Sequence, residues 1–186
     1  MDRTERIRLS KFMSLVLRHR PELLGVELDA GGWVDADTLL AACGENGRSA
    51  SRSDIEHVVA NCEKQRFAWS DCGQRIRASQ GHSTQVELGY EAVSPPDTLF
   101  HGTSRQRLDS IVRQGLCRMK RHHVHLSEDQ ETARRVGCRH GEAVVLTVRA
   151  AEMHADGHAF FVSANRVWLV EHVPAAFLVV PDPTSN

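Results

Sequence analysis

The run Ser94-Pro95-Pro96, near the middle of the chain, separates two stretches with different residue patterns. Paired prolines end regular structure and stiffen a connection, so the segment from Gly89 to Pro96 is the best candidate for a linker. A chain of 186 residues is long enough to form two small lobes that each bury a core. We therefore expect an α+β protein with domains at residues 1–90 and 97–186, joined by a linker at 91–96.

The first half of the chain has the apolar spacing of helices. Apolar residues recur at i, i+3, i+4, i+7 and i+8 from Leu9 to Leu17, which predicts an amphipathic helix from about Arg6 to His19. Pro21 ends this helix, because proline disfavours helical geometry at the preceding residue. The other elements expected here are a helix capped by Asp35 or Asp37, a helix from about Ser53, and strands Phe67–Ser70 and Arg75–Ala78. Helices followed by a hairpin predict a winged-helix lobe.

The second half is richer in short β-branched or aromatic runs, which are typical of strands. The expected strands are Leu99–His101, Val124–Leu126, Val144–Val148, Phe160–Val162, Val167–Val170 and Phe177–Val180. Two helices are expected between them, near Arg105–Gln114 and Asp129–Val136.

A basic cluster, Arg18-His19-Arg20, lies at the predicted end of the first helix. Cations at a helix C-terminus interact favourably with the helix dipole, so a charged cap is one interpretation of this cluster. Three similar elements favour a second interpretation: Lys64-Gln65-Arg66-Phe67, His101-Gly102-Thr103-Ser104 and Arg121–Ser127. Because guanidinium groups bind phosphate bidentately and imidazole can move protons, the four elements together predict a site that handles phosphate groups.

Composition and charge argue against several classes of protein. A formal net charge of −1 argues against a surface coated with positive charge for nonspecific nucleic-acid binding. Five cysteines with no C-x-x-C pair indicate neither a zinc site nor a disulfide framework. We find no apolar run long enough to span a bilayer and no signal segment. We therefore expect a cytoplasmic protein that uses no metal.

Short motifs occur along nearly the whole chain in the order found in one family. They are Leu9-Ser10-Lys11, Leu17-Arg18-His19, Gly32-Trp33-Val34, Asp54-Ile55, Lys64-Gln65-Arg66-Phe67, Gln80-Gly81-His82-Ser83, His101-Gly102-Thr103, His123-Val124-His125-Leu126-Ser127 and Val167-Trp168-Leu169. On these motifs the sequence resembles the NAD-dependent RNA 2′-phosphotransferases of the tRNA-splicing type, also called the KptA family. Each motif alone is weak, whereas the ordered series is specific.

The resemblance implies an RNA-binding winged-helix lobe followed by an ADP-ribosyltransferase-like lobe, a split β-sandwich that binds NAD. It also implies a reaction on RNA that carries an internal 2′-phosphate, as at a tRNA splice junction. In that reaction the phosphate is transferred to NAD through an RNA-2′-phospho-ADP-ribose intermediate. The products are nicotinamide, dephosphorylated RNA and ADP-ribose 1″,2″-cyclic phosphate. The expected partners are therefore RNA and NAD, with no membrane and no obligate protein partner.

The resemblance also implies roles for particular residues. Matching motifs position by position gives the family's catalytic set as Arg18, His19, Arg66 and Arg121. The expected NAD-binding residues are His101, Gly102, Thr103, Ser104, His125 and Ser127. Within this set, His101 is expected to hydrogen-bond an adenosine ribose hydroxyl. The Gly102 backbone is expected to meet the nicotinamide amide, an approach that the absence of a Cβ permits.

Two alternatives use the same lobes differently. An ADP-ribosyltransferase that caps terminal phosphates of RNA or DNA would stop after the first step. A winged-helix nucleic-acid-binding regulator would only sense NAD, but its expected recognition helix offers Asp54, Glu56 and His57, a poor surface for DNA phosphates. Protein-modifying ADP-ribosyltransferases place a catalytic glutamate on a late strand, whereas the matching stretch Asn165–Leu169 contains none.

Overall fold

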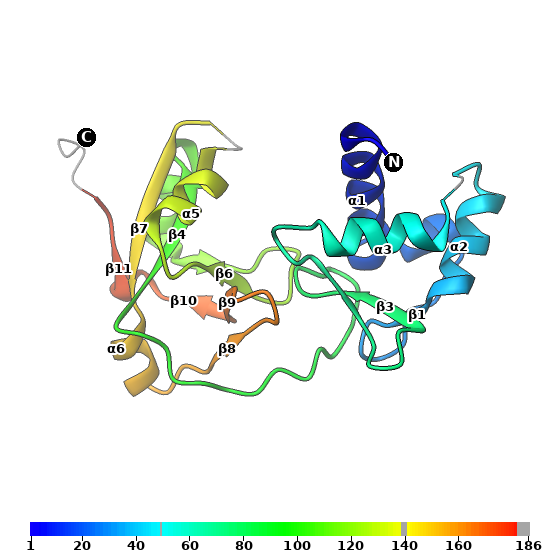
Figure 1. The fold of residues 1–186 in the computed structure, drawn as a ribbon. Coiled ribbons are helices and arrows are strands. Elements are labelled where there is room, and N and C mark those ends of the chain that lie inside the picture. Colours follow the sequence, from blue (N-terminus) through cyan, green and yellow to red (C-terminus); the bar gives the residue numbers. More distant parts are fainter. Residues whose placement is uncertain (49, 139–140, 182–186) are drawn as a thin grey trace. The chain divides into compact units, whose positions relative to one another are not determined.

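We describe the protein from a computed structural model, in which residues 1–48, 50–138 and 141–181 are described (Figure 1). The chain divides into two compact units, Met1–Gly89 (unit 1) and Tyr90–Asn186 (unit 2). Both units combine helices with small antiparallel sheets, so the fold is of the α+β type.

The division between the units falls after Gly89, at the start of the segment that the prolines mark. Ala92 forms an isolated β-bridge with Phe161, and the Val93 N–H donates to the Phe160 carbonyl at 2.9 Å. Part of the expected linker therefore pairs with a strand of unit 2.

Unit 1 is a set of helices with one three-stranded sheet. Its elements are α1 (Arg3–Arg18), the 3₁₀ helix η1 (Pro21–Leu24), β1 (Val34–Asp35), α2 (Ala36–Glu45), α3 (Arg52–Ala60), β2 (Phe67–Trp69) and β3 (Arg75–Ala78). The strands lie in the order β1-β3-β2, all antiparallel. Helix α1 begins three residues earlier than the apolar pattern predicts, because Asp2 and Glu5 form a capping box that satisfies orphan N–H groups.

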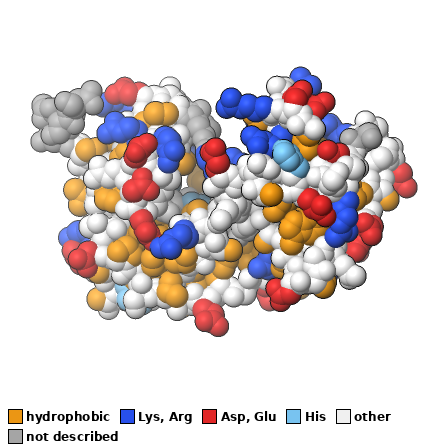
Figure 2. Space-filling view, viewed as in Figure 1, with side chains coloured by type: hydrophobic (Ala, Val, Ile, Leu, Met, Phe, Trp, Pro, Cys, Tyr) orange, Lys and Arg blue, Asp and Glu red, His pale blue; other side chains and the backbone are white. Residues whose placement is uncertain are grey.

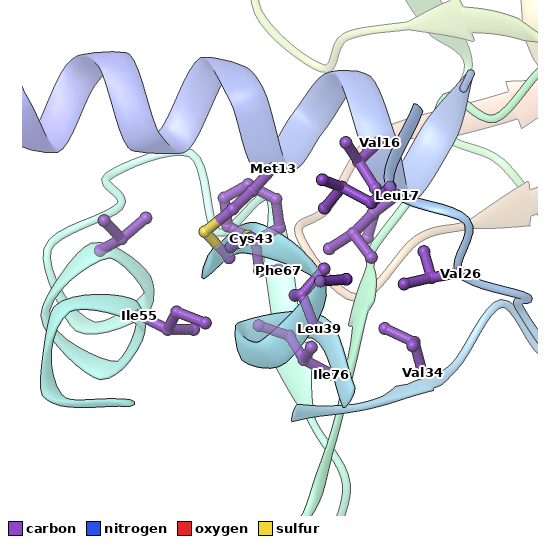
Figure 3. Close-up of a cluster of buried hydrophobic side chains, with 14 residues drawn as sticks. Met13, Val16, Leu17, Val26, Val34, Leu39, Cys43, Ile55, Phe67 and Ile76 are labelled. Carbon is purple, nitrogen blue, oxygen red and sulfur yellow. The ribbon is translucent and has the colours of Figure 1, made fainter. Parts of the chain in front are cut away.

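The core of unit 1 forms where the apolar side of α1 meets α2, α3 and the sheet. Met13, Val16 and Leu17 are each at most 1% exposed, and they pack with Leu39 and Ile76, among others (Figure 3). This burial holds the C-terminal end of α1, and with it the basic cluster that follows Leu17, against the rest of the unit.

Unit 2 is built around two three-stranded sheets and a two-stranded one. Its elements are β4 (Thr98–Ser104), η2 (Arg105–Arg107), α4 (Leu108–Gln114), β5 (Leu116–Cys117), β6 (Val124–Leu126), α5 (Gln130–Gly137), β7 (Ala143–Arg149), α6 (Ala150–Ala155), β8 (Phe160–Val162), β9 (Trp168–Val170), β10 (His172–Val173), η4 (Ala175–Phe177) and β11 (Leu178–Val179). The sheet orders are β11-β7-β4, β6-β9-β8 and β10-β5.

Two expectations for unit 2 are wrong. Helix α6 is a third helix where two were expected, and it was missed because Ala150–Ala155 is too short to show a helical period. Phe177 belongs to the 3₁₀ helix η4, and the strand that follows is only Leu178–Val179. Over so few residues, the pattern of apolar residues fits a strand and a helix equally well.

Candidate functional site

Arg18 and His19 lie at the end of α1, as the proline predicts. Arg18 is the last helical residue, and His19 caps the helix by donating its N–H to the Leu15 carbonyl at 3.0 Å. The Arg18 carbonyl accepts from the backbone N–H groups of Ser83, at 2.8 Å, and Thr84, at 3.3 Å. A segment more than sixty residues away therefore satisfies a carbonyl that the helix end leaves without a partner.

The His19 ring has its own contact with this segment. Its Nδ1 lies 3.0 Å from the Ser83 hydroxyl oxygen, and both side chains are exposed. A hydroxyl both donates and accepts, so this bond is compatible with either proton position on Nδ1.

Arg66 is placed by a tight turn that precedes β2. Gln65 adopts a left-handed backbone conformation with φ 41°, which is uncommon for a residue with a Cβ, and its N–H donates to the Cys62 carbonyl at 2.7 Å. Ser79 fixes the turn from the other side, since its hydroxyl donates to the Gln65 carbonyl at 2.8 Å. The Arg66 guanidinium in turn lies 3.5 Å, through Nη1, from the Cys62 sulfur.

The Arg66 carbonyl connects this turn with the helix end. It accepts from the Ser79 N–H at 2.9 Å and lies within 3.4 Å of Arg18 Nη2. The structure thus places the Arg18 guanidinium against the main chain of Arg66, although the helix and the turn are far apart in sequence. His19 follows Arg18 directly, and guanidinium and imidazole are groups suited to a phosphate dianion.

In unit 2, His101 lies on β4 and is held in one tautomer. Its Nδ1 lies 3.0 Å from the His125 carbonyl oxygen. A carbonyl only accepts, so Nδ1 carries the hydrogen and Nε2 is the acceptor of the neutral ring. Burial lowers the pKa of His101 below its ordinary value of 6.5, and the charge of Arg121 lowers it further. His101 is therefore a neutral hydrogen-bond acceptor at neutral pH.

Arg121 and His125 contact each other directly. Arg121 Nη1 lies 3.2 Å from His125 Nδ1, and guanidinium is only a donor, so His125 accepts through Nδ1. Because the His125 carbonyl also holds His101, the three residues form one connected group in unit 2.

Gly102 is required by packing, a reason that the sequence analysis did not give. A Cβ added there would lie 1.6 Å from the Ala133 carbonyl oxygen of α5 and 2.9 Å from the Gly137 backbone nitrogen. The N–H and carbonyl of Phe100 both pair with Ser127, on the side of β4 that faces away from β7. Residues two apart in a strand direct their backbone groups to the same side, so the Gly102 N–H and carbonyl also face away from β7. Those two backbone groups offer a donor and an acceptor for the expected amide contact, whereas the absence of a Cβ makes room for α5.

The remaining expected NAD residues lie around the same strand. Thr103 and Ser104 are buried at the end of β4, and Ser127 exchanges two backbone hydrogen bonds with Phe100, at 2.8 and 2.9 Å. Strand alternation places His101 and Thr103 on the face opposite α5. A hollow of about 710 Å³ in unit 2 lies elsewhere, since its lining is Ser94–Thr98, Glu128 and Trp168.

Sequence reasoning missed the residues that position the cationic groups, namely Cys62, Gln65, Ser79 and Ser83. The motif Gln80-Gly81-His82-Ser83 was noticed, but nothing in its residue types indicates that its serine contacts a histidine sixty-four positions away.

Two general findings concern what the described residues contain. Over 1–48, 50–138 and 141–181, no three His, Cys, Asp or Glu side chains are grouped so that they could hold a metal ion. None of the helices in this described part is long and apolar enough to cross a membrane.

On the face shown in Figure 2, Lys and Arg side chains are interspersed with Asp and Glu, as a net charge of −1 suggests.

Clustered arginines beside imidazoles are typical of enzymes that transfer phosphate groups. Comparison with known proteins agrees with this class. The family described as RNA 2'-phosphotransferase, Tpt1 / KptA family, matches residues 4–172. This chain belongs to that family of enzymes.

Relatives named "Probable RNA 2'-phosphotransferase" are similar over most of their length. The one from Streptomyces coelicolor is 50% identical over 183 residues, which is 98% of this chain and 100% of the relative. The one from Nostoc punctiforme is 49% identical over 172 residues, covering 92% and 95% of the two chains. The one from Burkholderia lata is 51% identical over 172 residues, covering 92% and 89%.

Proposed function

We propose that this protein removes an internal 2′-phosphate from RNA by transferring it to NAD. The observation that carries the proposal is the contact of Arg18, beside His19 at the end of α1, with the Arg66 carbonyl, in a member of an RNA 2′-phosphotransferase family. A phosphate monoester carries up to two negative charges at neutral pH, and fixed guanidinium groups bind it bidentately.

The residues of unit 2 fit NAD as the second substrate. A neutral His101 with Nδ1–H held by the His125 carbonyl presents Nε2 as an acceptor for a ribose hydroxyl. The edge of Gly102 offers one donor and one acceptor, which is what a carboxamide such as that of nicotinamide requires. We assign Thr103, Ser104, His125 and Ser127 to the surroundings of the same ligand.

The proposed reaction has two steps. In the first, an oxygen of the RNA 2′-phosphate bonds to the ribose carbon that carries nicotinamide, and nicotinamide leaves with the electrons of the broken C–N bond. In the second, the adjacent ribose 2″-hydroxyl loses its proton and attacks phosphorus, and the RNA O2′ leaves and takes up a proton. The products are RNA with a free 2′-hydroxyl and ADP-ribose 1″,2″-cyclic phosphate.

The two steps need different help from the protein. The first starts from an anion and a good leaving group, so positioning by Arg18 and Arg66 dominates it. The second gathers charge on phosphorus and moves protons, which calls for guanidinium groups and an acid–base group. We assign His19 to the proton transfer of the second step and Arg121 to stabilising charge in the reaction.

We also infer the class of each unit. Unit 1, with helices followed by the β2–β3 hairpin, fits a winged-helix RNA-binding domain at about residues 1–90. Unit 2, with separate three-stranded sheets and His101 on its first long strand, fits an ADP-ribosyltransferase-like domain. These assignments support RNA binding by the first unit and NAD binding by the second.

The test is incubation of the purified protein with NAD and an oligonucleotide that carries one internal 2′-phosphate. We expect a 2′-hydroxyl product and the cyclic phosphate only when NAD is present, with or without chelator. An oligonucleotide with a terminal phosphate alone is the control. A product that keeps ADP-ribose on a terminal phosphate would favour the capping reaction, and turnover without NAD would contradict the proposal.

A further inference from the structure

The segment Ser79–Thr84, which follows β3 in unit 1, contacts every proposed phosphate-handling residue of that unit. At its start, Ser79 holds the Gln65–Arg66 turn through its hydroxyl and its N–H, at 2.8 and 2.9 Å. At its end, Ser83 and Thr84 hold the Arg18 carbonyl. The segment is thus a backbone support for two arginines, and none of its residues has a role in the reaction described above.

Ser83 is the member of this segment that contacts an imidazole. Its main chain is fixed by the 2.8 Å bond to the Arg18 carbonyl, and Arg18 is the residue before His19. The Ser83 backbone is therefore anchored beside His19, and its hydroxyl oxygen lies 3.0 Å from His19 Nδ1. Although both side chains are exposed, this anchoring reduces the entropy lost when the bond forms, which is what allows it to compete with water.

We propose that Ser83 is a positioning residue for His19. By occupying Nδ1 it orients the ring so that proton exchange with the substrate takes place through Nε2. A ring that exchanges its proton through Nε2 carries Nδ1–H both before and after, so the serine oxygen can accept from Nδ1–H in both protonation states. The bond between Ser83 and His19 does not depend on the proposed function, but its expected effect on the reaction does.

That consequence is confined to one step. The second step takes a proton from the ribose 2″-hydroxyl and returns one to the RNA O2′, so an imidazole that rotates away slows it. The first step moves no proton, and it depends on Arg18 and Arg66, whose supports in this segment are backbone bonds and the hydroxyls of Ser79 and Thr84. Loss of the Ser83 hydroxyl should therefore separate the two steps.

The kinetic experiment compares three variants in a single-turnover time course with labelled 2′-phosphorylated RNA and excess NAD. For Ser83→Ala we expect the second step to slow about 10- to 100-fold while the first stays within about threefold, so that RNA-phospho-ADP-ribose accumulates. Ser83→Thr keeps the hydroxyl and should restore the second step. Ser94→Ala, which removes the hydroxyl of another exposed serine beside an imidazole, that of His154 in unit 2, should behave like the wild type. Equal slowing of both steps by Ser83→Ala would overturn the proposal.

A second measurement needs no substrate. Two-bond ¹H–¹⁵N spectra of the imidazole nitrogens report the protonation and tautomer of His19 directly, with His19→Gln used to assign its signals. We expect Ser83→Ala to shift the His19 nitrogens and Ser94→Ala, at a serine that contacts His154, to leave them unchanged. Unchanged nitrogens in Ser83→Ala would contradict the proposed bond, even if activity falls. If the wild-type protein shows no transfer at all, the proposed function fails, whereas these spectra still decide whether Ser83 orients His19.

Discussion

His19 in unit 1 and His101 in unit 2 are both held through Nδ1, but by partners of opposite character. The partner of His19 is the Ser83 hydroxyl, which donates or accepts. The partner of His101 is the His125 carbonyl, which only accepts. His19 is exposed, whereas His101 is half-buried and burial lowers its pKa. The Ser83 hydroxyl is compatible with either position of the His19 hydrogen, whereas the carbonyl fixes the hydrogen of His101 on Nδ1.

The difference indicates how one chain obtains two functions from one residue type. An imidazole that must gain and lose a proton needs a partner that keeps its bond throughout, which a hydroxyl can do as donor or acceptor. An imidazole that must recognise a hydroxyl needs a fixed acceptor, and a carbonyl partner with burial provides one. We therefore connect His19 with chemistry and His101 with binding.

The largest expected effect comes from removing the ring that exchanges protons. His19→Ala should lower kcat by about 10²- to 10⁴-fold, the range of a lost general acid or base, with KM for NAD nearly unchanged. His57→Ala is the matched control, because His57 is exposed on α3 and its ring lies beside Asn61 of the next turn. Similar kcat values for the two variants would end the assignment of His19.

The second prediction concerns the stability of unit 2 and the packing of α5 on β4. Gly102→Ala should lower the free energy of unfolding by about 3 kcal/mol or more, because the new Cβ would overlap the Ala133 carbonyl. Gly44→Ala, in helix α2 where a Cβ meets nothing within 4 Å, should instead raise it by about 0.5–1 kcal/mol. Urea unfolding of both variants measures the contrast. A Gly102→Ala protein as stable as the wild type would show that α5 does not pack on β4 as described.

Removing the His101 ring should have a smaller effect, and it should change KM more than kcat. His101→Ala should raise KM for NAD about 5- to 30-fold, the equivalent of about one to two hydrogen bonds, with a smaller change in kcat. Steady-state kinetics at varied NAD and saturating RNA measures it. A loss confined to kcat would mean that His101 acts on the reacting groups.

The smallest expected effect is a pH dependence of stability. The pKa of His101 is lowered in the folded state from its ordinary value of 6.5, so below about pH 6.5 the unfolded chain takes up a proton that the folded protein does not. Stability should therefore fall as the pH drops from 7.5 to 5.5, by up to about 1.4 kcal/mol for this one group. His101→Asn, which keeps a donor for the His125 carbonyl but cannot titrate, should lose correspondingly less in urea unfolding. Equal losses would show that His101 does not contribute.

Much of unit 1 follows from local sequence signals. The apolar spacing of α1 and Pro21 predict the first helix and its end, and β3 is found over the predicted residues Arg75–Ala78. The earlier start of α1 depends on the Asp2 capping box, a side-chain bond that an apolar period does not report. Unit 2 was less predictable, because β5 and β10 have two residues each and form only by pairing with each other, and α6 has six residues.

The same distinction holds for the site. Arg18, His19, Arg66 and Arg121 could be named from motifs, because guanidinium and imidazole carry their chemistry in the residue type. Ser83, Ser79 and Cys62 could not, since a serine or cysteine gains its role only when the fold brings it to a particular atom. Gly102 was named for a contact with NAD, yet its lack of a Cβ is explained by α5.

The most direct test of this account is a rapid-quench time course that follows labelled 2′-phosphate through substrate, RNA-phospho-ADP-ribose and cyclic phosphate. We predict that His19→Ala forms the intermediate at nearly the wild-type rate and then accumulates it. We predict that His101→Ala forms the intermediate slowly, does not accumulate it, and recovers when the NAD concentration is raised. A His19→Ala protein that stops before the intermediate, or a His101→Ala protein that accumulates it, would contradict the division between a ring for chemistry and a ring for binding.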